Sequence, residues 1–220
     1  MIEAVFFDLD GTLYDRDALA AALVGEQYDA FARDLAAVPK DVFVRRALEM
    51  DDHGHGEKSE GYARLVREWG LPAALAEWLV EYFWTSYDRH CTLSDDTRET
   101  LATLRAHGKK LAVITNGGAA RQAQKLAALG LADALDAVLI SGAEGVRKPD
   151  AEIFRRALER CRVGAAETIF VGDNPEADIA GALGAGLGAI WKHVPYWRLE
   201  SPGVPVVHSL REILPLCLGK

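Results

Sequence analysis

The sequence predicts an α/β protein with a parallel sheet, interrupted near the N-terminus by a purely helical segment. Short apolar runs alternate with longer stretches in which apolar residues recur at helical spacing. Such alternation is typical of a parallel sheet with helices on both faces. One stretch, residues 15–88, contains only helix-like blocks. These observations predict a Rossmann-like three-layer core that carries an inserted four-helix cap.

Five apolar runs are expected to form the sheet. The first covers residues 4–7 and stops abruptly at Asp8, and the others cover 111–114, 137–140, 168–171 and 187–191. A fully apolar run that ends at a turn is typical of a strand buried on both faces. Helices are expected between the strands at 95–107, 119–129, 151–161 and 175–183. Gly108 and Gly130 lie where helix ends favour a residue that tolerates positive φ.

The interrupting segment is expected to form four helices, at about residues 18–37, 41–50, 59–69 and 72–87. Pro39, the loop 54–56 and Gly70 separate these blocks. The chain therefore divides into a core, residues 1–14 and 89–220, and a helical cap, residues 15–88. Ligands of open α/β sheets bind at the carboxyl ends of the strands, so a segment inserted after the first strand is expected to act as a lid there.

Composition disfavours several classes of function. The net charge of -8 argues against a nucleic-acid or acidic-membrane partner, because both require clustered Lys and Arg. No apolar run approaches the length of a membrane span, and the acidic residues among the first ten do not fit a signal peptide. Cys91, Cys161 and Cys217 lie far apart, which favours reduced packing residues over a zinc site. We expect a cytoplasmic protein, and its oligomeric state stays open.

Polar residues that carry chemistry follow the predicted strands in four clusters. Because the carboxyl ends of parallel strands meet at one edge of a sheet, we expect the clusters to converge. They supply carboxylates, one ammonium group, a hydroxyl and glycine-rich backbone. The clusters are Asp8-Leu9-Asp10-Gly11-Thr12, Thr115-Asn116-Gly117-Gly118, Lys148-Pro149, and Gly172-Asp173-Asn174-Pro175 with Asp178.

Each of these groups suits phosphoryl transfer. Carboxylates are the oxygen ligands that Mg²⁺ prefers, and a carboxylate can also attack phosphorus to form a covalent intermediate. Lys148 offers a point charge for phosphoryl oxygens, and the hydroxyl and amides at 115–117 can donate hydrogen bonds to them. Adjacent carboxylates repel one another, so a lysine and a metal are needed to keep them ionised.

In this order the four clusters resemble the motifs of the haloacid dehalogenase superfamily, over nearly the whole chain outside the insertion. The resemblance implies a magnesium-dependent phosphoric monoester hydrolase of the phosphatase branch. Its substrate is expected to be a small phosphorylated metabolite of nucleotide or sugar-phosphate type. The helical insertion after the first motif resembles the helical cap of this family, whose contacts select the substrate.

The resemblance also implies the chemistry of the two aspartates in the first motif. Asp8 is expected to be the nucleophile that becomes an aspartyl-phosphate. Asp10 is expected to protonate the leaving oxygen and then to activate water. Mg²⁺ is expected to be held by the side chains of Asp8 and Asp173 and by the backbone carbonyl of Asp10.

The remaining motif residues are expected to bind phosphate or to support those that do. Thr115 and the Asn116 amide would bind phosphate, and Lys148 would neutralise both the nucleophile and the phosphate. Asp178 would orient Lys148 or a metal-bound water. Two further residues are expected to support this arrangement: Thr12 and Gly117.

Three alternative functions stay open. A sugar-phosphate mutase would use the same Asp8 and Asp10 but return the phosphoryl group to the substrate. Haloacid dehalogenases lack the second aspartate of the first motif, so the presence of Asp10 disfavours that activity. A non-catalytic metabolite-binding protein would be expected to have lost Asp8, Asp10, Lys148 or Asp173, and all four are present.

Several polar and aromatic residues have simpler interpretations. Asp178 could merely complement the dipole of a helix that begins near it. His53 and His55 do not complete a zinc site, so a solvated loop is expected there. Lys58 is expected to be a solvated charge unless it reaches the substrate. The aromatic residues near the last predicted strand are expected to line a pocket or pack an interface: Trp191, Tyr196 and Trp197.

Overall fold

The computed structural model describes residues 1–131, 134–198 and 203–219. The chain divides into two compact units. The first unit, the α/β unit, comprises Met1–Tyr14 and Thr92–Lys220. The second, the helical unit, comprises Asp15–Cys91, and it contains helices and turns but no strand.

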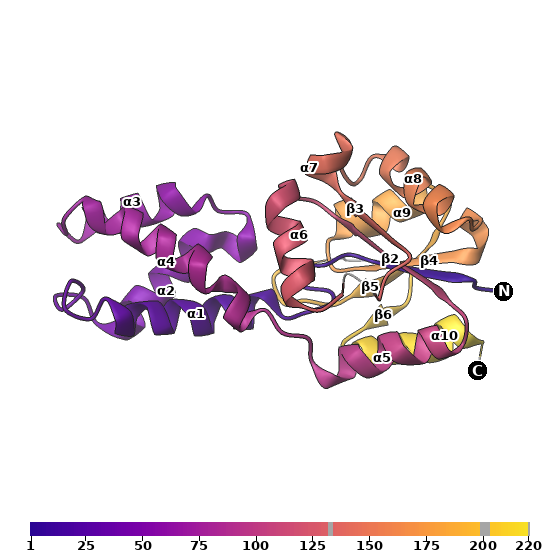
Figure 1. The fold of residues 1–220 in the computed structure, drawn as a ribbon, viewed down its shortest axis with the longest axis horizontal. Helices are drawn as coiled ribbons and strands as arrows, with labels where there is room; N and C mark the ends of the chain where they lie inside the picture. Colours follow the sequence, from indigo (N-terminus) through magenta and orange to yellow (C-terminus); the bar gives the residue numbers. More distant parts are fainter. Residues whose placement is uncertain (132–133, 199–202, 220) are drawn as a thin grey trace. The chain divides into compact units, whose positions relative to one another are not determined.

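A parallel six-stranded sheet forms the α/β unit, with the order β3-β2-β1-β4-β5-β6 (Figure 1). The central strand β1 pairs with β2 on one side and with β4 on the other, so that Phe7 lies opposite Val113 and Val171. The predicted fold class is confirmed, and β6 is an addition because two residues are too few to form a recognisable pattern. The strands are β1 (Ala4–Phe7), β2 (Lys110–Thr115), β3 (Ala137–Ile140), β4 (Thr168–Gly172), β5 (Gly188–Lys192) and β6 (Val206–Val207).

Helices cover both faces of this sheet and complete three layers (Figure 1). Helices α5 (Asp95–Ala106) and α10 (Ile213–Leu218) lie together on one face. The other face carries α8 (Ala151–Cys161) and α9 (Gly181–Gly184). The helix expected at 175–183 instead begins as a π-helical turn. The remaining elements of the unit are α6 (Ala119–Ala128), α7 (Ser141–Glu144), η2 (Ala165–Glu167), η3 (Pro175–Ala180) and η4 (Leu210–Glu212).

The core of the α/β unit follows from the apolar strands. All four residues of β1 are buried, and so are the apolar residues of β2. Phe170 on β4 meets Phe154 on α8, with ring centroids 5.2 Å apart in an edge-to-face arrangement. Burial on both faces removes the central strands from water, so the residues that follow them are held on a rigid base.

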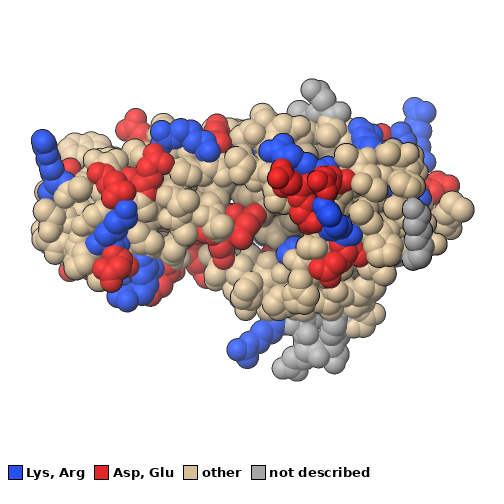
Figure 2. All heavy atoms as spheres, turned by 90° about the horizontal axis from the view of Figure 1, so that it is seen from below, with Lys and Arg blue, Asp and Glu red and all other residues tan. Residues whose placement is uncertain are grey.

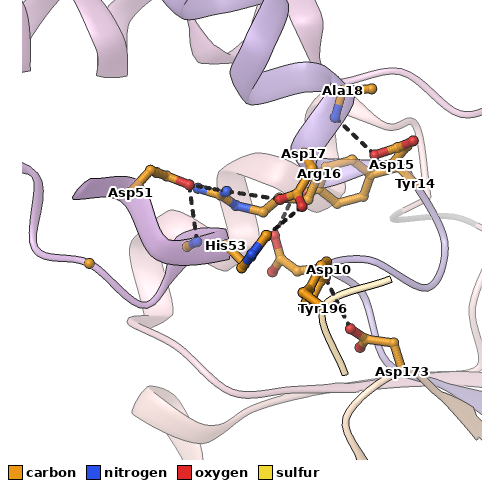
Figure 3. A network of polar contacts seen from close by, with 12 residues as sticks. Asp10, Tyr14, Asp15, Arg16, Asp17, Ala18, Asp51, His53, Asp173 and Tyr196 are labelled. Atoms are coloured by element: carbon orange, nitrogen blue, oxygen red, sulfur yellow. Dashed lines mark hydrogen bonds and ion pairs between the residues drawn. The ribbon is translucent and has the colours of Figure 1, made fainter. Parts of the chain in front are cut away.

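The helical unit is built from α1 (Arg16–Ala30), α2 (Lys40–Asp51), α3 (Lys58–Glu68) and α4 (Ala74–His90), with the short η1 (Asp52–Gly54) between α2 and α3. Helix α1 begins at Asp15, whose side chain accepts a hydrogen bond from the Ala18 amide at 2.9 Å (Figure 3). Inside the unit, the buried Tyr62 hydroxyl donates to Gln27 Oε1 at 2.7 Å.

The first helix of this unit is shorter than predicted. The pattern favoured helix over 18–37, but α1 ends at Ala30 and turns occupy 31–37. The turns bury Leu35 and Val38, and the Tyr28 hydroxyl donates to the carbonyl of Val38 at 2.8 Å. Pro39 also disfavours a helical conformation at the residue before it. Tertiary contacts therefore end the helix one to two turns early.

Charged side chains of both signs are interspersed on the face shown in Figure 2. Within the described ranges, none of the helices is both long enough and apolar enough to cross a membrane.

Candidate active site

The predicted site residues of the α/β unit lie at the carboxyl edge of its sheet. Asp8 follows the central strand β1, Thr115 ends β2, and Asp173 follows β4. β2 and β3 lie on one side of β1, and the later strands β4 to β6 lie on the other side, so the strand order reverses between β1 and β4. Ligands of parallel sheets bind at such a switch point. The sheet topology thus brings three of the four motifs together, at Asp8, Thr115 and Asp173.

Lys148 supplies the fourth motif and neutralises two carboxylates. Its Nζ lies 2.6 Å from Asp8 Oδ1 and 2.7 Å from Asp178 Oδ1, and its side chain is 2% exposed. Burial alone would lower the pKa of Lys148, but the charges of Asp178 and Asp8 outweigh this and raise it. Lys148 is therefore a fixed positive charge in contact with Asp8, the predicted nucleophile.

The backbone of Lys148 is held by the side chain of Asn116. Asn116 Nδ2 donates to the Lys148 carbonyl, and the Lys148 amide donates to Asn116 Oδ1, both at 3.0 Å. The second motif thereby fixes the third. Asp178 is held in a similar way, because its Oδ2 accepts the Asn174 amide at 2.9 Å. The Asn116 side chain is thus occupied by its two hydrogen bonds to the Lys148 backbone.

Three buried carboxylates at this edge form a donor set for a divalent cation. Ligand oxygens of Asp8, Asp173 and Asp178 lie within 4.8 Å of one another. Burial is the main cause that raises the pKa of Asp8; Lys148 opposes the increase and Asp178 adds to it. Burial, followed by the charges of Asp8 and Asp178, raises the pKa of Asp173. A hard divalent cation fits this oxygen-only, mutually repelling set.

Asp173 is oriented by Trp191, which lies on β5, and by Tyr196, which follows β5. The Trp191 indole donates to the Asp173 carbonyl at 2.6 Å, and the Tyr196 hydroxyl donates to Asp173 Oδ2 at 3.3 Å (Figure 3). Gly11 lies against the same carboxylate, since a Cβ there would be 2.9 Å from Asp173 Oδ2. Trp191 and Tyr196 thus contact the site itself.

Asp10 is surrounded by hydrogen-bond donors that the sequence analysis did not single out. Lys125 Nζ lies 2.6 Å from its Oδ1, Gln122 Nε2 lies 2.8 Å from its Oδ2, and the Tyr14 hydroxyl also donates to Oδ1 (Figure 3). Burial alone would raise the pKa of Asp10, but Lys125, Gln122 and Tyr14 together lower it. Asp10 is therefore ionised in the resting site.

A signal for two of these donors was present in the sequence. Gln122 and Lys125 are three residues apart on α6, which begins directly after the predicted 115–118 turn. Residues at this spacing share one face of a helix. Polar residues that are spaced for one face, on a helix that starts at the site, are therefore candidates for contacts with it.

The supporting residues of the motifs are also close to this edge. The Thr12 side chain is buried, and its hydroxyl has no hydrogen-bond partner among the described residues. The Gly117 amide donates to Ser141 Oγ at 2.9 Å, which ties the second motif to α7.

The structure places His53 and Lys58 in different surroundings. His53 is partly exposed, and its Nδ1 lies 2.5 Å from Asp17 Oδ2. Lys58 is not the solvated charge that was predicted. It is 8% exposed, and its Nζ lies 2.5 Å from Asp51 Oδ1, because Asp51 is buried beside it and requires a counter-charge.

The three cysteines are free and buried, as the sequence predicted.

Together, the fold and the site define an α/β enzyme with an acidic centre neutralised by a buried lysine. A family model described as haloacid dehalogenase-like hydrolase matches residues 2–186. The chain therefore belongs to the haloacid dehalogenase-like hydrolases.

Two similar proteins are named as phosphatases, and one similar solved structure is named as a dehalogenase. The chain is 35% identical over 209 residues to a ribulose-1,5-bisphosphate 5-phosphatase from Halopiger xanaduensis, covering 86% of this chain and 84% of that protein. It is 31% identical over 203 residues to a glyceraldehyde 3-phosphate phosphatase from Pyrococcus furiosus, covering 90% and 84%. The crystal structure of a 2-haloacid dehalogenase from Pseudomonas syringae pv. Tomato DC3000 matches with a TM-score of 0.64 at 29% identity, covering 100% and 99%.

Proposed function

We propose that this protein is a magnesium-dependent phosphatase that hydrolyses the phosphate monoester of a small metabolite through an aspartyl-phosphate. One observation carries the proposal: the buried Asp8 carboxylate directly follows the central strand, and Lys148 Nζ lies 2.6 Å from its Oδ1. A carboxylate fixed in this way has a positive charge beside it to attract the phosphoryl group. The relatives named as phosphatases of small sugar phosphates support the same reaction class.

In the first step, Asp8 forms a bond to phosphorus while the bond from phosphorus to the leaving oxygen breaks. A proton on Asp10 goes to that oxygen. Resting Asp10 is ionised, but the dianionic phosphoryl group raises the pKa of nearby carboxylates, so Asp10 takes up this proton when substrate binds. Proton donation matters most for poor leaving groups such as sugar alkoxides.

In the second step, water attacks phosphorus and gives a proton to Asp10, and the bond between phosphorus and Asp8 breaks. Inorganic phosphate is released and Asp8 is a carboxylate again. Lys148 stays charged throughout, because Asp178 and Asp8 flank it. The Thr115 hydroxyl and the backbone amide of Asn116 are proposed to bind the phosphoryl oxygens.

Mg²⁺ would be held by the side chains of Asp8 and Asp173 and by the backbone carbonyl of Asp10. When bound, it supplies positive charge that offsets the repulsion between carboxylates and phosphate. Tyr196 and Trp191 fix Asp173 for this role through its carboxylate and its carbonyl. Asp178 is proposed to orient Lys148, with which it forms a buried ion pair.

The helical unit, Asp15–Cys91, is proposed to be the cap that selects the substrate, and the α/β unit to be the catalytic core. Because the cap would enclose only a small leaving group, phosphoproteins and polynucleotides are expected to be poor substrates. Within the small-metabolite class, we propose a sugar phosphate or a nucleotide. The cytoplasmic location expected from the composition remains a prediction.

A phosphate-release screen tests this function. Purified protein with Mg²⁺ is incubated with sugar phosphates, nucleotides, glycerol phosphate and p-nitrophenyl phosphate, and Asp8→Asn serves as the control. We expect Mg²⁺-dependent phosphate release by the wild type only, because an amide cannot form the acyl-phosphate. Near-normal rates for a repurified Asp8→Asn sample would rule out the covalent mechanism.

The same screen separates the alternatives. A mutase would isomerise a sugar phosphate with little phosphate release. A dehalogenase would release halide from a haloacid in the presence of chelator, and the half-buried, hydrogen-bonded Asp10 argues against that activity. A binding protein would release neither phosphate nor halide.

A further inference from the structure

Helix α6 directs two buried polar side chains at Asp10. Lys125 Nζ lies 2.6 Å from Asp10 Oδ1, and Gln122 Nε2 lies 2.8 Å from Oδ2. The two oxygens of one carboxylate are thus each held by a donor from the same helix. Lysine side chains are rarely buried unless they are paired, and that of Lys125 is only 11% exposed. Lys125 is therefore not a solvated surface lysine.

Gln122 also contacts the second motif. Its Nε2 lies 2.5 Å from Thr115 Oγ, so one amide group joins Asp10 to the hydroxyl proposed to bind phosphate. A hydroxyl can donate one hydrogen bond and accept two. Because Gln122 donates to the Thr115 oxygen, the Thr115 hydrogen remains available for a phosphoryl oxygen. A glutamate at position 122 would instead place a carboxylate, which only accepts hydrogen bonds, against the Asp10 carboxylate and the Thr115 oxygen.

The glycine of the second motif makes room for this arrangement. Gly117 has φ 148°, and a Cβ there would lie 2.9 Å from Gln122 Cγ and 3.1 Å from Gln122 Cδ. Real Cβ atoms essentially never make a contact of 2.9 Å, so a larger residue would displace the Gln122 side chain. Gly117 thus serves the placement of Gln122 as well as the turn itself.

We propose that Gln122 and Lys125 are positioning residues, which hold the Asp10 carboxylate in place for proton transfer to and from the leaving oxygen. The inference rests on the proposed phosphatase function, in which Asp10 transfers the protons. Neither residue is proposed to touch the substrate. Their effect on the rate is expected to pass through Asp10.

Leaving-group dependence provides the test. A misplacement of about 1 Å can cost about 10²-fold in rate, and proton donation matters little when the leaving group is a weak base such as p-nitrophenolate. We expect Lys125→Met and Gln122→Leu to lower kcat/KM about 10- to 100-fold on an alkyl phosphate but less than about threefold on p-nitrophenyl phosphate. Lys125→Arg should restore part of the lost rate.

Two controls separate positioning from a general loss of structure. Lys40→Met makes the same change as Lys125→Met at an exposed lysine that pairs with Asp29, and it should leave both rates near wild type. In an Asp10→Asn background, Lys125→Met and Gln122→Leu should cause no further loss, because the group they position is already inactive. Thermal unfolding of each variant shows whether it is folded.

Each other outcome is decisive. Equal losses on both phosphates, full additivity with Asp10→Asn, or unchanged rates would each overturn the positioning role while leaving a phosphatase. A wild-type protein that releases no phosphate from any ester would overturn the proposed function, and the inference would fall with it.

Discussion

The Lys148 ammonium lies 2.6 Å from Asp8 Oδ1, although 140 residues separate the two in the sequence. The pair joins the loop after the central strand to the loop that precedes α8, and Asp178 holds the lysine from the other side. The lysine is thus fixed where a phosphoryl group would bear its negative charge.

Lys148→Met should therefore lower kcat/KM on every phosphate ester by about 10²–10³-fold, the usual loss when one preorganised electrostatic contact is removed. Phosphate release measured with p-nitrophenyl phosphate and with the best natural ester checks this. Lys40→Met, which removes an exposed lysine paired with Asp29, is the matched control and should stay near wild type. A small loss for Lys148→Met would mean that the metal alone neutralises the phosphate.

The strands and the four motifs were predictable because each depends on a local pattern. The apolar run that forms β1, for example, coincides with the observed bounds Ala4–Phe7. What the sequence did not reveal depends on tertiary contacts. Lys125 has the same local context as a solvated helix lysine, and only the folded chain shows its contact with Asp10. Lys58 was wrongly predicted to be solvated because its partner, Asp51, approaches only after α2 and α3 pack.

Metal dependence should be visible in stability as well as in activity. A ligand that binds only the folded state raises its stability by RT ln(1 + [L]/Kd). We expect MgCl2 to raise the Tm of the wild type and chelator to abolish phosphate release. Asp173→Asn should lose most of the Tm shift, because it removes one carboxylate of the buried set. An unchanged Tm shift in Asp173→Asn would place the cation elsewhere.

Substrate choice should depend on exposed residues of the helical unit. His53 is 41% exposed, in a loop where Asp52 and His53 both have positive φ. Non-glycine residues in this conformation cluster at functional sites. We expect His53→Gln to change the ranking of kcat/KM among sugar phosphates and nucleotides more than it changes the rate on p-nitrophenyl phosphate. A collapsed generic rate with an unchanged ranking would assign the loop to folding or to chemistry.

The helical unit also contains a buried ionic cluster that should govern its stability. Asp51 is buried between two cations. Arg16 Nη2 donates to its Oδ1 at 2.7 Å (Figure 3). Lys58 Nζ lies 2.5 Å from the same oxygen. A cation–π contact adds to this, with Lys58 Nζ 5.3 Å from the centroid of the Phe83 ring. Removing the shared carboxylate takes the nearest negative charge away from two buried cations. Breaking a buried pair in this way typically costs about 3–5 kcal/mol.

Asp51→Asn should therefore lower the free energy of unfolding at pH 7 by about that amount, whereas Asp29→Asn, at an exposed pair with Lys40, should cost less than about 1 kcal/mol. Burial alone would raise the pKa of Asp51, but Arg16 and Lys58 lower it below its ordinary value. A carboxyl whose pKa is lower in the folded state stabilises the protein above the unfolded pKa of about 3.9, and this contribution is lost as the pH falls through the folded pKa. The gap between wild type and Asp51→Asn in urea unfolding should thus be widest at neutral pH and shrink below about pH 4. A gap that stays constant down to pH 3 would show that Asp51 acts through packing rather than charge.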